Sequence, residues 1–160
     1  MVTVRPARPG ELEELADIGL ASWKKGIMPL VTAEVASRIE KDNPFIPFLQ
    51  EQGANIFVAE TNGALAGIGA SEHADNHISD IWVAPVHEGK GIGSALVKAL
   101  EEQFRRRGFS EATIRVSADN RRALGLYLHL GYCETWRGFA YDPILGVTLE
   151  NVALTRPLEA

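Results

Sequence analysis

The start of the chain changes from a two-residue alternation of hydrophobic and polar positions to helical spacing. Residues 2–6 alternate as a strand does. After Pro9-Gly10 the apolar positions fall on one side of a helix that we expect to reach about residue 23. These apolar positions are Leu12, Leu15, Ile18 and Leu20.

A second and a third helical segment follow. Thr32 has the side chain of an N-cap, and the helix behind it should end near residue 42. Asn43-Pro44 interrupts the helical pattern, because the residue before a proline avoids the helical conformation. Residues 45–49 then predict a further short helix.

The hydrophobic period returns to two in the middle of the chain. Residues 56–60 predict a strand, residues 61–63 a hairpin turn, and residues 64–73 the returning strand. Asp75-Asn76 forms another turn into a strand over residues 77–83. Together with these turns, the three strands predict an antiparallel meander.

The second half of the chain alternates helices with strands. Residues 91–107 predict a long helix with Leu96, Leu100 and Phe104 on one face and Gly108 just after its end. The later elements are a strand at 111–117, a helix at 120–130, and strands at 132–137 and 147–155. The crossover through the long helix should be parallel and right-handed. The predicted fold is α+β: a single domain over residues 1–160 whose mixed, largely antiparallel sheet is flanked by helices.

Composition excludes several classes of protein. The 160 residues are 46% hydrophobic and 23% charged, and no apolar run approaches the ~18 residues that span a bilayer. The 16 basic and 21 acidic residues argue against a nucleic-acid surface. The first residues lack a signal-peptide pattern, and a lone Cys133 cannot form an internal disulfide. We therefore expect a cytoplasmic protein without membrane or nucleic-acid partners, and a buried Cys133.

The segment Val83–Leu96 indicates a phosphate receptor. It reads as the end of a strand, a glycine-rich turn and the start of a helix. Gly89, Gly91 and Gly93 leave the backbone bare, so that several N–H groups can converge, and the helix N-terminus adds partial positive charge. Such a cavity suits a pyrophosphate.

Two familiar phosphate motifs do not fit this segment. A P-loop requires Gly-x-x-x-x-Gly-Lys-Ser/Thr, whereas Gly89-Lys90 is followed by Gly91 and preceded by Ala84 at the position of the first glycine. A nicotinamide-binding fold requires Gly-x-Gly-x-x-Gly directly after a first strand. Here the spacing is Gly-x-Gly-x-Gly and an antiparallel meander comes first.

A second group of residues downstream gives the third interpretation. Asn120 and Tyr127 are seven residues apart and project from the same side of the predicted helix. With Glu88-Gly-Lys-Gly-Ile-Gly93, Ile81-Trp-Val-x-Pro85 and the run from Asn120 to Gly131-Tyr132, the chain resembles the GCN5-related N-acetyltransferases. The cofactor signature of that family is Arg/Gln-x-x-Gly-x-Gly/Ala. The resemblance covers nearly the whole chain.

The resemblance implies acetyl-CoA as co-substrate. His73, Asp75 and His77 lie around one turn, but no further ligand is evident, so we expect no metal. The resemblance also implies that the strand at Ile81 diverges from the strand at 111–117, and that its free backbone pairs with the pantetheine arm. The amides of the glycine turn would hold the pyrophosphate. The implied cofactor-binding residues are Ile81, Trp82, Val83, Glu88, Gly89, Lys90, Gly91, Ile92, Gly93, Ser94 and Asn120.

Acetyl transfer to an amine requires the amine to lose a proton and the thiolate to gain one. The resemblance implies Tyr127 as proton donor to the sulfur, whereas burial in the core is its structural alternative. Asp80 is the candidate base, acting directly or through water, although strand alternation leaves open which side it faces. Glu72, His73 and His77 are further candidates, and a chain of waters would need no single base. Some relatives carry a glutamate where this chain has Arg115.

Glu88 departs from the family signature, because an acid replaces arginine or glutamine beside two phosphates. Either its side chain turns outward or cofactor affinity is weakened, so a non-catalytic module that binds CoA or acyl-CoA remains the alternative function. Trp23 and residues 24–28 are expected between two helices, where they would wall the acceptor site. The acceptor is expected to be a primary amine on a small molecule or peptide, and the family also allows a homodimer.

Overall fold

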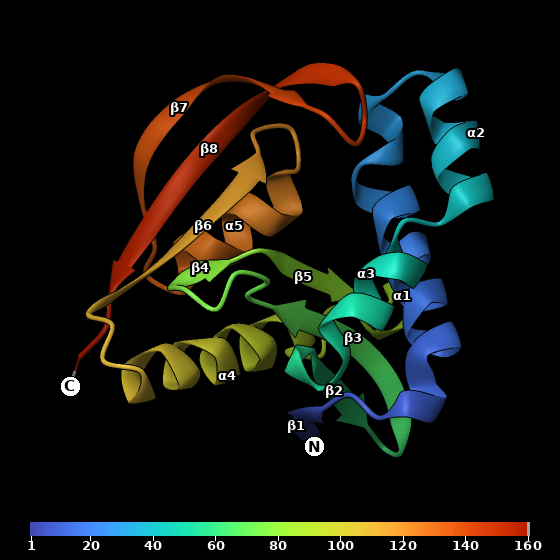
Figure 1. Ribbon diagram of the computed structural model, residues 1–160. Helices are drawn as coiled ribbons and strands as arrows, with labels where there is room; N and C mark the ends of the chain where they lie inside the picture. The colour runs from blue at the N-terminus through green and yellow to red at the C-terminus, as the bar shows by residue number, and fades with distance from the viewer. Residues whose placement is uncertain (160) are drawn as a thin grey trace.

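The strands of the computed structural model, which describes residues 1–159, form two four-stranded sheets (Figure 1). Sheet A contains, in order, β1 (Val2–Pro6), β2 (Phe57–Thr61), β3 (Ala64–Ala70) and β5 (Asp80–Val83), each antiparallel to its neighbour. Sheet B contains β4 (His77–Ile78), β6 (Glu111–Ser117), β8 (Val147–Pro157) and β7 (Cys133–Asp142). The helices are α1 (Leu12–Gly26), α2 (Ala33–Asp42), α3 (Phe45–Gln52), α4 (Ile92–Arg106) and α5 (Arg121–His129). The predicted α+β class is confirmed, with two sheets in place of one.

The strand predicted over residues 77–83 is broken at Ser79. Its backbone N–H donates to the carbonyl of Ala70 at 2.9 Å, and its hydroxyl donates to the same oxygen at 3.0 Å and accepts from the N–H of Glu72. These bonds turn the chain away from a continuous strand. As a result β4 pairs in parallel with β6, as the crossover prediction required, while β5 pairs with β3.

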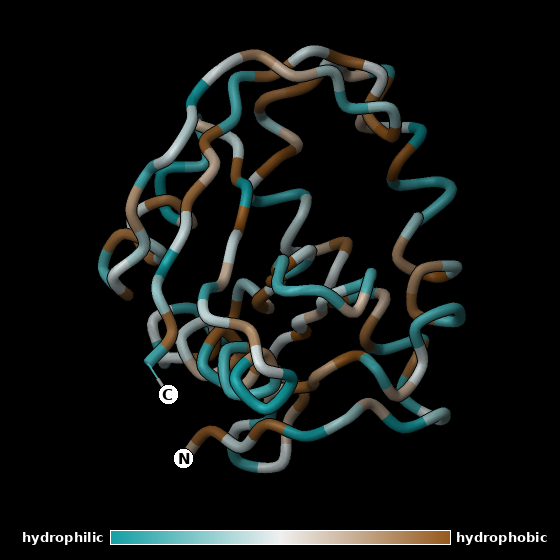
Figure 2. The backbone as a smooth tube through the Cα atoms, turned by 60° about the vertical axis from the view of Figure 1, so that its left-hand side comes forward, coloured by the Kyte–Doolittle hydropathy of each residue, from teal (hydrophilic) through white to brown (hydrophobic). Residues whose placement is uncertain are grey.

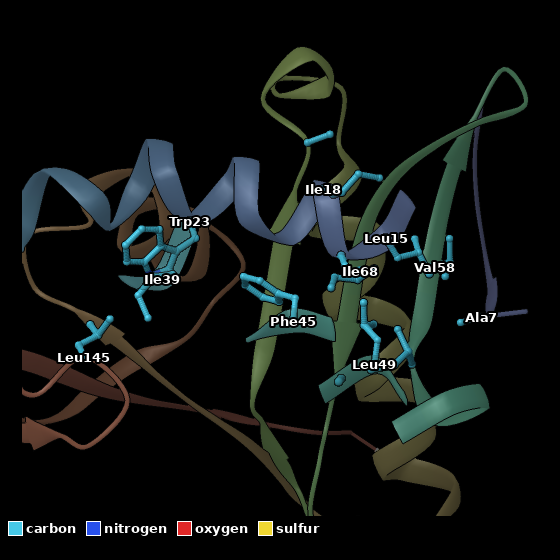
Figure 3. Packing of buried hydrophobic residues seen from close by; sticks show 14 of the residues in the cluster. Ala7, Leu15, Ile18, Trp23, Ile39, Phe45, Leu49, Val58, Ile68 and Leu145 are labelled. Atoms are coloured by element: carbon cyan, nitrogen blue, oxygen red, sulfur yellow. The ribbon is translucent and has the colours of Figure 1, made fainter. Parts of the chain in front are cut away.

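The helices pack on both faces of sheet A. On one face α1 and α3 bury Val58 and Ile68 in a cluster that also holds Trp23 (Figure 3). On the other face α4 packs Ile92 and Leu96 against the small residues of β2 and β3. The C-terminal half of α4 and all of α5 cover one face of sheet B. Sheet A is thus the middle layer of a three-layer arrangement, and α4 continues from it to sheet B.

The start of α2 agrees with the prediction, whereas the end of α1 differs from it. Thr32 caps α2 as predicted, with its hydroxyl accepting from the N–H of Val35 at 3.3 Å. The first helix continues past residue 23 to Gly26, so Trp23 lies inside α1 and is buried beside Ile39, rather than in a connection between helices. Tertiary packing explains the extension, because the last turn of α1 covers part of the core.

The β7–β8 hairpin is longer than predicted, and its turn reaches α2 (Figure 1). There the guanidinium of Arg38 donates to the carbonyl of Ile144 at 2.7 Å, and Leu145 is buried. Cys133 is exposed, so the prediction that it is a core residue is wrong. It begins β7, an edge strand of sheet B whose residues are mostly exposed.

Hydrophilic and hydrophobic residues alternate along the helices in Figure 2. In residues 1–159, no helix is both long enough and apolar enough to cross a membrane.

A buried ionic network joins α4 to sheet B. Glu101, which is 1% exposed, accepts a hydrogen bond from the Tyr132 hydroxyl and another from the Arg156 guanidinium, each at 2.7 Å. Each carboxylate oxygen thus has a hydrogen-bond donor, and one donor is a cation, which is the condition under which a buried charge is tolerated. The network fixes the far half of α4 against β8 and the start of β7.

Glu101→Ala should therefore destabilise the protein by about 3 kcal/mol, because it leaves the Tyr132 hydroxyl and the Arg156 guanidinium without their acceptor. The matched control is Glu102→Ala, since Glu102 is exposed and pairs with Arg105 and Arg106 on the helix surface. That change should stay within about 0.5 kcal/mol. Urea unfolding measures both, and equal losses for the two variants would contradict the structural role of Glu101.

Candidate active site

A cleft of about 650 Å³ brings most of the predicted site residues together. Its walls are β5, the glycine turn, the first turn of α4, the first two turns of α5 and the last turn of α1. The predicted residues that line it are Ile81, Trp82, Val83, Glu88, Gly89, Gly91, Ile92, Gly93, Ser94, Asn120 and Tyr127. Lys90 and Asp80 are not among the lining residues.

The glycine turn presents backbone N–H groups to this cleft. Gly89 and Gly91 have φ values of 77° and 81°, a region that favours glycine, and a Cβ atom on either would meet nothing within 4 Å. Gly91 is the N-cap of α4, and no described side chain caps that helix end. The first N–H groups of the helix therefore lack an intrahelical partner and carry the positive end of the helix dipole. The arrangement suits an anion.

Gly93 allows close packing of α4 against α5 and also leaves the backbone of the turn accessible. A Cβ atom at Gly93 would lie 2.8 Å from Leu126 on α5, so the glycine allows the two helices to approach closely. The Ile92 side chain is buried in the core with Leu96, which leaves only its backbone for the cleft. Lys90 is exposed, with its ammonium nitrogen 3.1 Å from His87 Nδ1.

The break at Ser79 leaves one edge of β5 free. Residues 80–83 pair with β3, and in the described part of the chain no strand pairs with their other edge. β6, which the strand would otherwise meet, pairs with β4 and β8 instead. The divergence that the resemblance implied is therefore present, and the free backbone groups of Ile81 to Val83 can pair with an extended polyamide.

Tyr127 projects from α5 between the core and the cleft. The residue is 5% exposed, its ring packs edge-on against Tyr132 with centroids 6.2 Å apart, and it lines the cleft. Burial raises the pKa of the Tyr127 hydroxyl well above its usual range, and the negative charge of Asp80 raises it further. The phenol therefore keeps its proton at neutral pH.

Asp80 lies on the opposite side of β5 from Ile81, within electrostatic reach of Tyr127. Its Oδ1 accepts a hydrogen bond from Trp82 Nε1 at 2.9 Å, and Trp82 packs edge-on against Phe45 of α3. The two side chains thus share the face covered by α1 and α3, which decides the orientation left open by strand alternation. Burial raises the pKa of the Asp80 carboxyl, and the hydrogen bonds from Trp82 and Ser79 oppose that rise.

The other candidate bases have different surroundings. His77 Nδ1 lies 2.7 Å from Thr113 Oγ1, and burial lowers the pKa of the His77 ring. His73 is exposed, and its Nε2 lies 3.4 Å from Glu72 Oε1. Arg115 stacks on Trp136, with the guanidinium carbon 5.1 Å from the ring centroid.

The Glu88 side chain does not turn outward. Its Oε2 lies 2.7 Å from the Lys25 ammonium and 3.2 Å from the Arg122 guanidinium, and the side chain is 16% exposed. Both cations line the cleft. Arg122 is a residue of the site that the sequence analysis did not predict. Its position two residues after Asn120, in the first turn of a helix that faces the glycine turn, is the signal that would have identified it.

Asn120 is the N-cap of α5. Its side-chain oxygen accepts from the N–H of Ala123 at 3.4 Å. A Cβ atom on Gly26 would lie 3.5 Å from the amide nitrogen of Asn120, so the last turn of α1 meets the start of α5 beside the cleft. Asn120 thus combines a capping role with a position in the cleft.

Known proteins share this arrangement of sheets, turn and helices. A GCN5-related N-acetyltransferase from Rhodopseudomonas palustris superimposes with a TM-score of 0.78 at 25% identity, over 98% of this chain and 95% of that one. The putative acetyltransferase yncA from Salmonella typhimurium, solved with acetyl-CoA, gives a TM-score of 0.70 at 19% identity, over 100% and 95% of the two chains. That likeness shows the fold.

Sequence comparison gives a narrower assignment. Human N-acetyltransferase 8B is 29% identical over 114 residues, which are 66% of this chain and 50% of that protein. Bovine thialysine N-epsilon-acetyltransferase is 34% identical over 71 residues, which are 41% of this chain and 42% of that protein. The chain therefore matches half or less of the length of these two relatives. The model of the acetyltransferase (GNAT) family matches residues 20–132, from the second half of α1 to the end of the signature at Tyr132. On this match the chain belongs to the GNAT family.

Proposed function

We propose that this protein is an acetyl-CoA-dependent N-acetyltransferase that transfers the acetyl group to a primary amine by direct attack within a ternary complex. The observation that carries the proposal is the cleft itself, in which the free edge of β5, the uncapped N-terminus of α4 and the buried Tyr127 lie together. The yncA structure solved with acetyl-CoA has the same fold and supports this choice of co-substrate.

The residues of the cleft divide the binding of coenzyme A between them. The N–H groups from Gly89 to Ser94 would hold the pyrophosphate, because they lie at the positive end of α4. The free backbone of Ile81 to Val83 would pair with the amides of the pantetheine arm as an added strand. Those contacts direct the thioester end of the molecule toward Tyr127.

The thioester supplies an acetyl carbon that an amine can attack. The amine nitrogen forms the new C–N bond, the C–S bond breaks, and the Tyr127 hydroxyl gives its proton to the departing sulfur. Asp80 accepts the proton that the amine releases, directly or through water, from the α1 and α3 side of β5. Cys133 lies outside the cleft, which argues against an acetyl-cysteine intermediate.

The alternative function is a non-catalytic module that binds CoA or acyl-CoA. The observation in its favour is Glu88, whose carboxylate stands at the phosphate end of the cleft. Release of thiol from acetyl-CoA in the presence of a panel of primary amines separates the two functions, since a binding module would give none.

Acetyl-CoA and CoA should each raise the melting temperature of the protein, and NAD should not. At a ligand concentration near 100 times Kd, binding adds about 2.7 kcal/mol of stability. For a domain of this size that is a rise of about 5–10 °C. Differential scanning fluorimetry measures the shift, and the absence of a shift with both CoA species would refute the proposed cofactor.

Tyr127→Phe should lower kcat about 100-fold while leaving the Kd for acetyl-CoA within about twofold of the wild-type value, because only the proton donor is lost. The phenylalanine ring keeps the packing against Tyr132, so the melting temperature should not fall. Tyr141→Phe is the control, since Tyr141 is exposed on β7. Steady-state thiol release and calorimetric titration supply the two constants, and unchanged turnover would remove Tyr127 from the mechanism.

Asp80→Asn should abolish the rise of kcat/KM with pH, with a loss of about 100-fold at neutral pH. In the wild type this rise should pass through the pKa of Asp80, which burial holds above the ordinary 3.8, because only the ionised carboxylate accepts a proton. A pH–rate profile of both proteins tests the role. A variant that keeps the wild-type profile would leave amine deprotonation to water.

The same change should stabilise the folded protein. Because the folded-state pKa of Asp80 is raised, the folded state binds more protons than the unfolded state between the two pKa values, and stability falls as the pH rises through that window. Asparagine carries no charge, so Asp80→Asn should unfold at a higher urea concentration than the wild type at pH 7. A lower midpoint would show that Asp80 has a structural role instead.

A further inference from the structure

The Glu88 carboxylate joins three separate parts of the cleft. Lys25 comes from the last turn of α1, Glu88 from the turn before α4, and Arg122 from the first turn of α5. The Glu88 side chain is 16% exposed, whereas those of Lys25 and Arg122 are 54% and 64% exposed. The anion is therefore enclosed, while both cations remain accessible to a second anion.

We propose that Lys25 and Arg122 form a phosphate clamp for coenzyme A, and that the Glu88 carboxylate occupies this clamp until the cofactor arrives. The inference rests on the proposed binding of coenzyme A and adds two binding residues outside the glycine turn. A carboxylate and a phosphate offer the same kind of acceptor oxygens to an ammonium and a guanidinium. The phosphate carries more charge and more acceptor oxygens, so it can displace the carboxylate.

The charges around the cleft favour this exchange. Among its lining residues, Lys25, Arg121 and Arg122 are cationic, and Glu88 and Asp119 are anionic. The N-terminus of α4 adds partial positive charge beside them. Once Glu88 moves out toward solvent, the phosphates of coenzyme A can take its place beside both cations.

The clamp is closed in the described conformation. The last turn of α1 meets the N-cap of α5, since a Cβ atom on Gly26 would lie 3.5 Å from the amide nitrogen of Asn120. The two helices that carry Lys25 and Arg122 therefore already stand at the spacing that lets one anion bridge them. Glu88 holds both cations in place and makes a monovalent anion a poor competitor, so the clamp selects a polyphosphorylated ligand.

Calorimetric titration of coenzyme A into the purified full chain tests the proposal. Glu88→Gln should tighten binding about 3- to 10-fold, because the internal competitor loses its charge, and Lys25→Met and Arg122→Met should each weaken it by a similar factor. Lys24→Met and Glu40→Gln are matched controls, since this neighbouring ion pair, at 3.4 Å, lies outside the cleft lining. Both controls should leave Kd within about twofold of the wild-type value.

The direction of the change in Kd for coenzyme A in Glu88→Gln shows whether Glu88 competes with the cofactor or bridges the two cations as part of the binding site. Weaker or unchanged binding in Glu88→Gln would overturn the proposal, as would unchanged binding in both cation variants. Melting temperatures of all variants identify any that fail to fold, and Lys25→Gln and Arg122→Gln provide second variants at each cation. Binding of coenzyme A to the wild type reports separately on the proposed function.

Dephospho-CoA identifies which phosphate the clamp holds. If the losses in Lys25→Met and Arg122→Met disappear with this ligand, the clamp binds the 3′-phosphate. If they persist, it binds the pyrophosphate. If Lys24→Met weakens binding of either ligand as much as Lys25→Met and Arg122→Met do, the effect comes from the overall positive charge of the protein, and the proposed clamp is wrong.

Discussion

The hydrogen bonds of Ser79 are the interactions on which the cleft depends. By bonding to Ala70 and Glu72, Ser79 divides one stretch of extended chain between two sheets. Buried backbone groups must find partners, and each half of the stretch finds them in a different sheet. The edge of β5 that faces away from β3 is then left for a ligand or water. A continuous strand would have filled this edge with β6.

Opposite charges compensate one another at the end of the cleft formed by the glycine turn. Left-handed glycines before α4 expose its uncapped N-terminus, which concentrates partial positive charge at one point. Lys25 and Arg122 bring two full positive charges to the same region, and Glu88 neutralises part of them. An acid in the signature of an anion-binding turn is thus consistent with the fold, because its own partners surround it.

Glu101, Asp80 and Tyr127 are polar groups away from the surface whose surroundings differ in what they offer the charged form. Glu101 has a strong donor for each of its oxygens and holds α4 to sheet B. Asp80 is only partly compensated, so burial raises its pKa, and a group of this kind suits proton transfer. Tyr127 is held in its neutral form by burial and faces the cleft. The first stabilises the fold, whereas the ionised form of Asp80 opposes folding and the Tyr127 ring packs in the core beside Tyr132.

The sequence by itself determined most of the elements, the glycine turn and the shared helix side of Asn120 and Tyr127, because hydrophobic period, glycine spacing and helical spacing are local properties. It missed the break at Ser79 and the exposure of Cys133, since both depend on which strand lies alongside. Only the tertiary structure decided which way Asp80 faces and what surrounds Glu88. The partners of Glu88 come from residues 63 positions before it and 34 after it in the chain, and no local pattern encodes a contact at that separation.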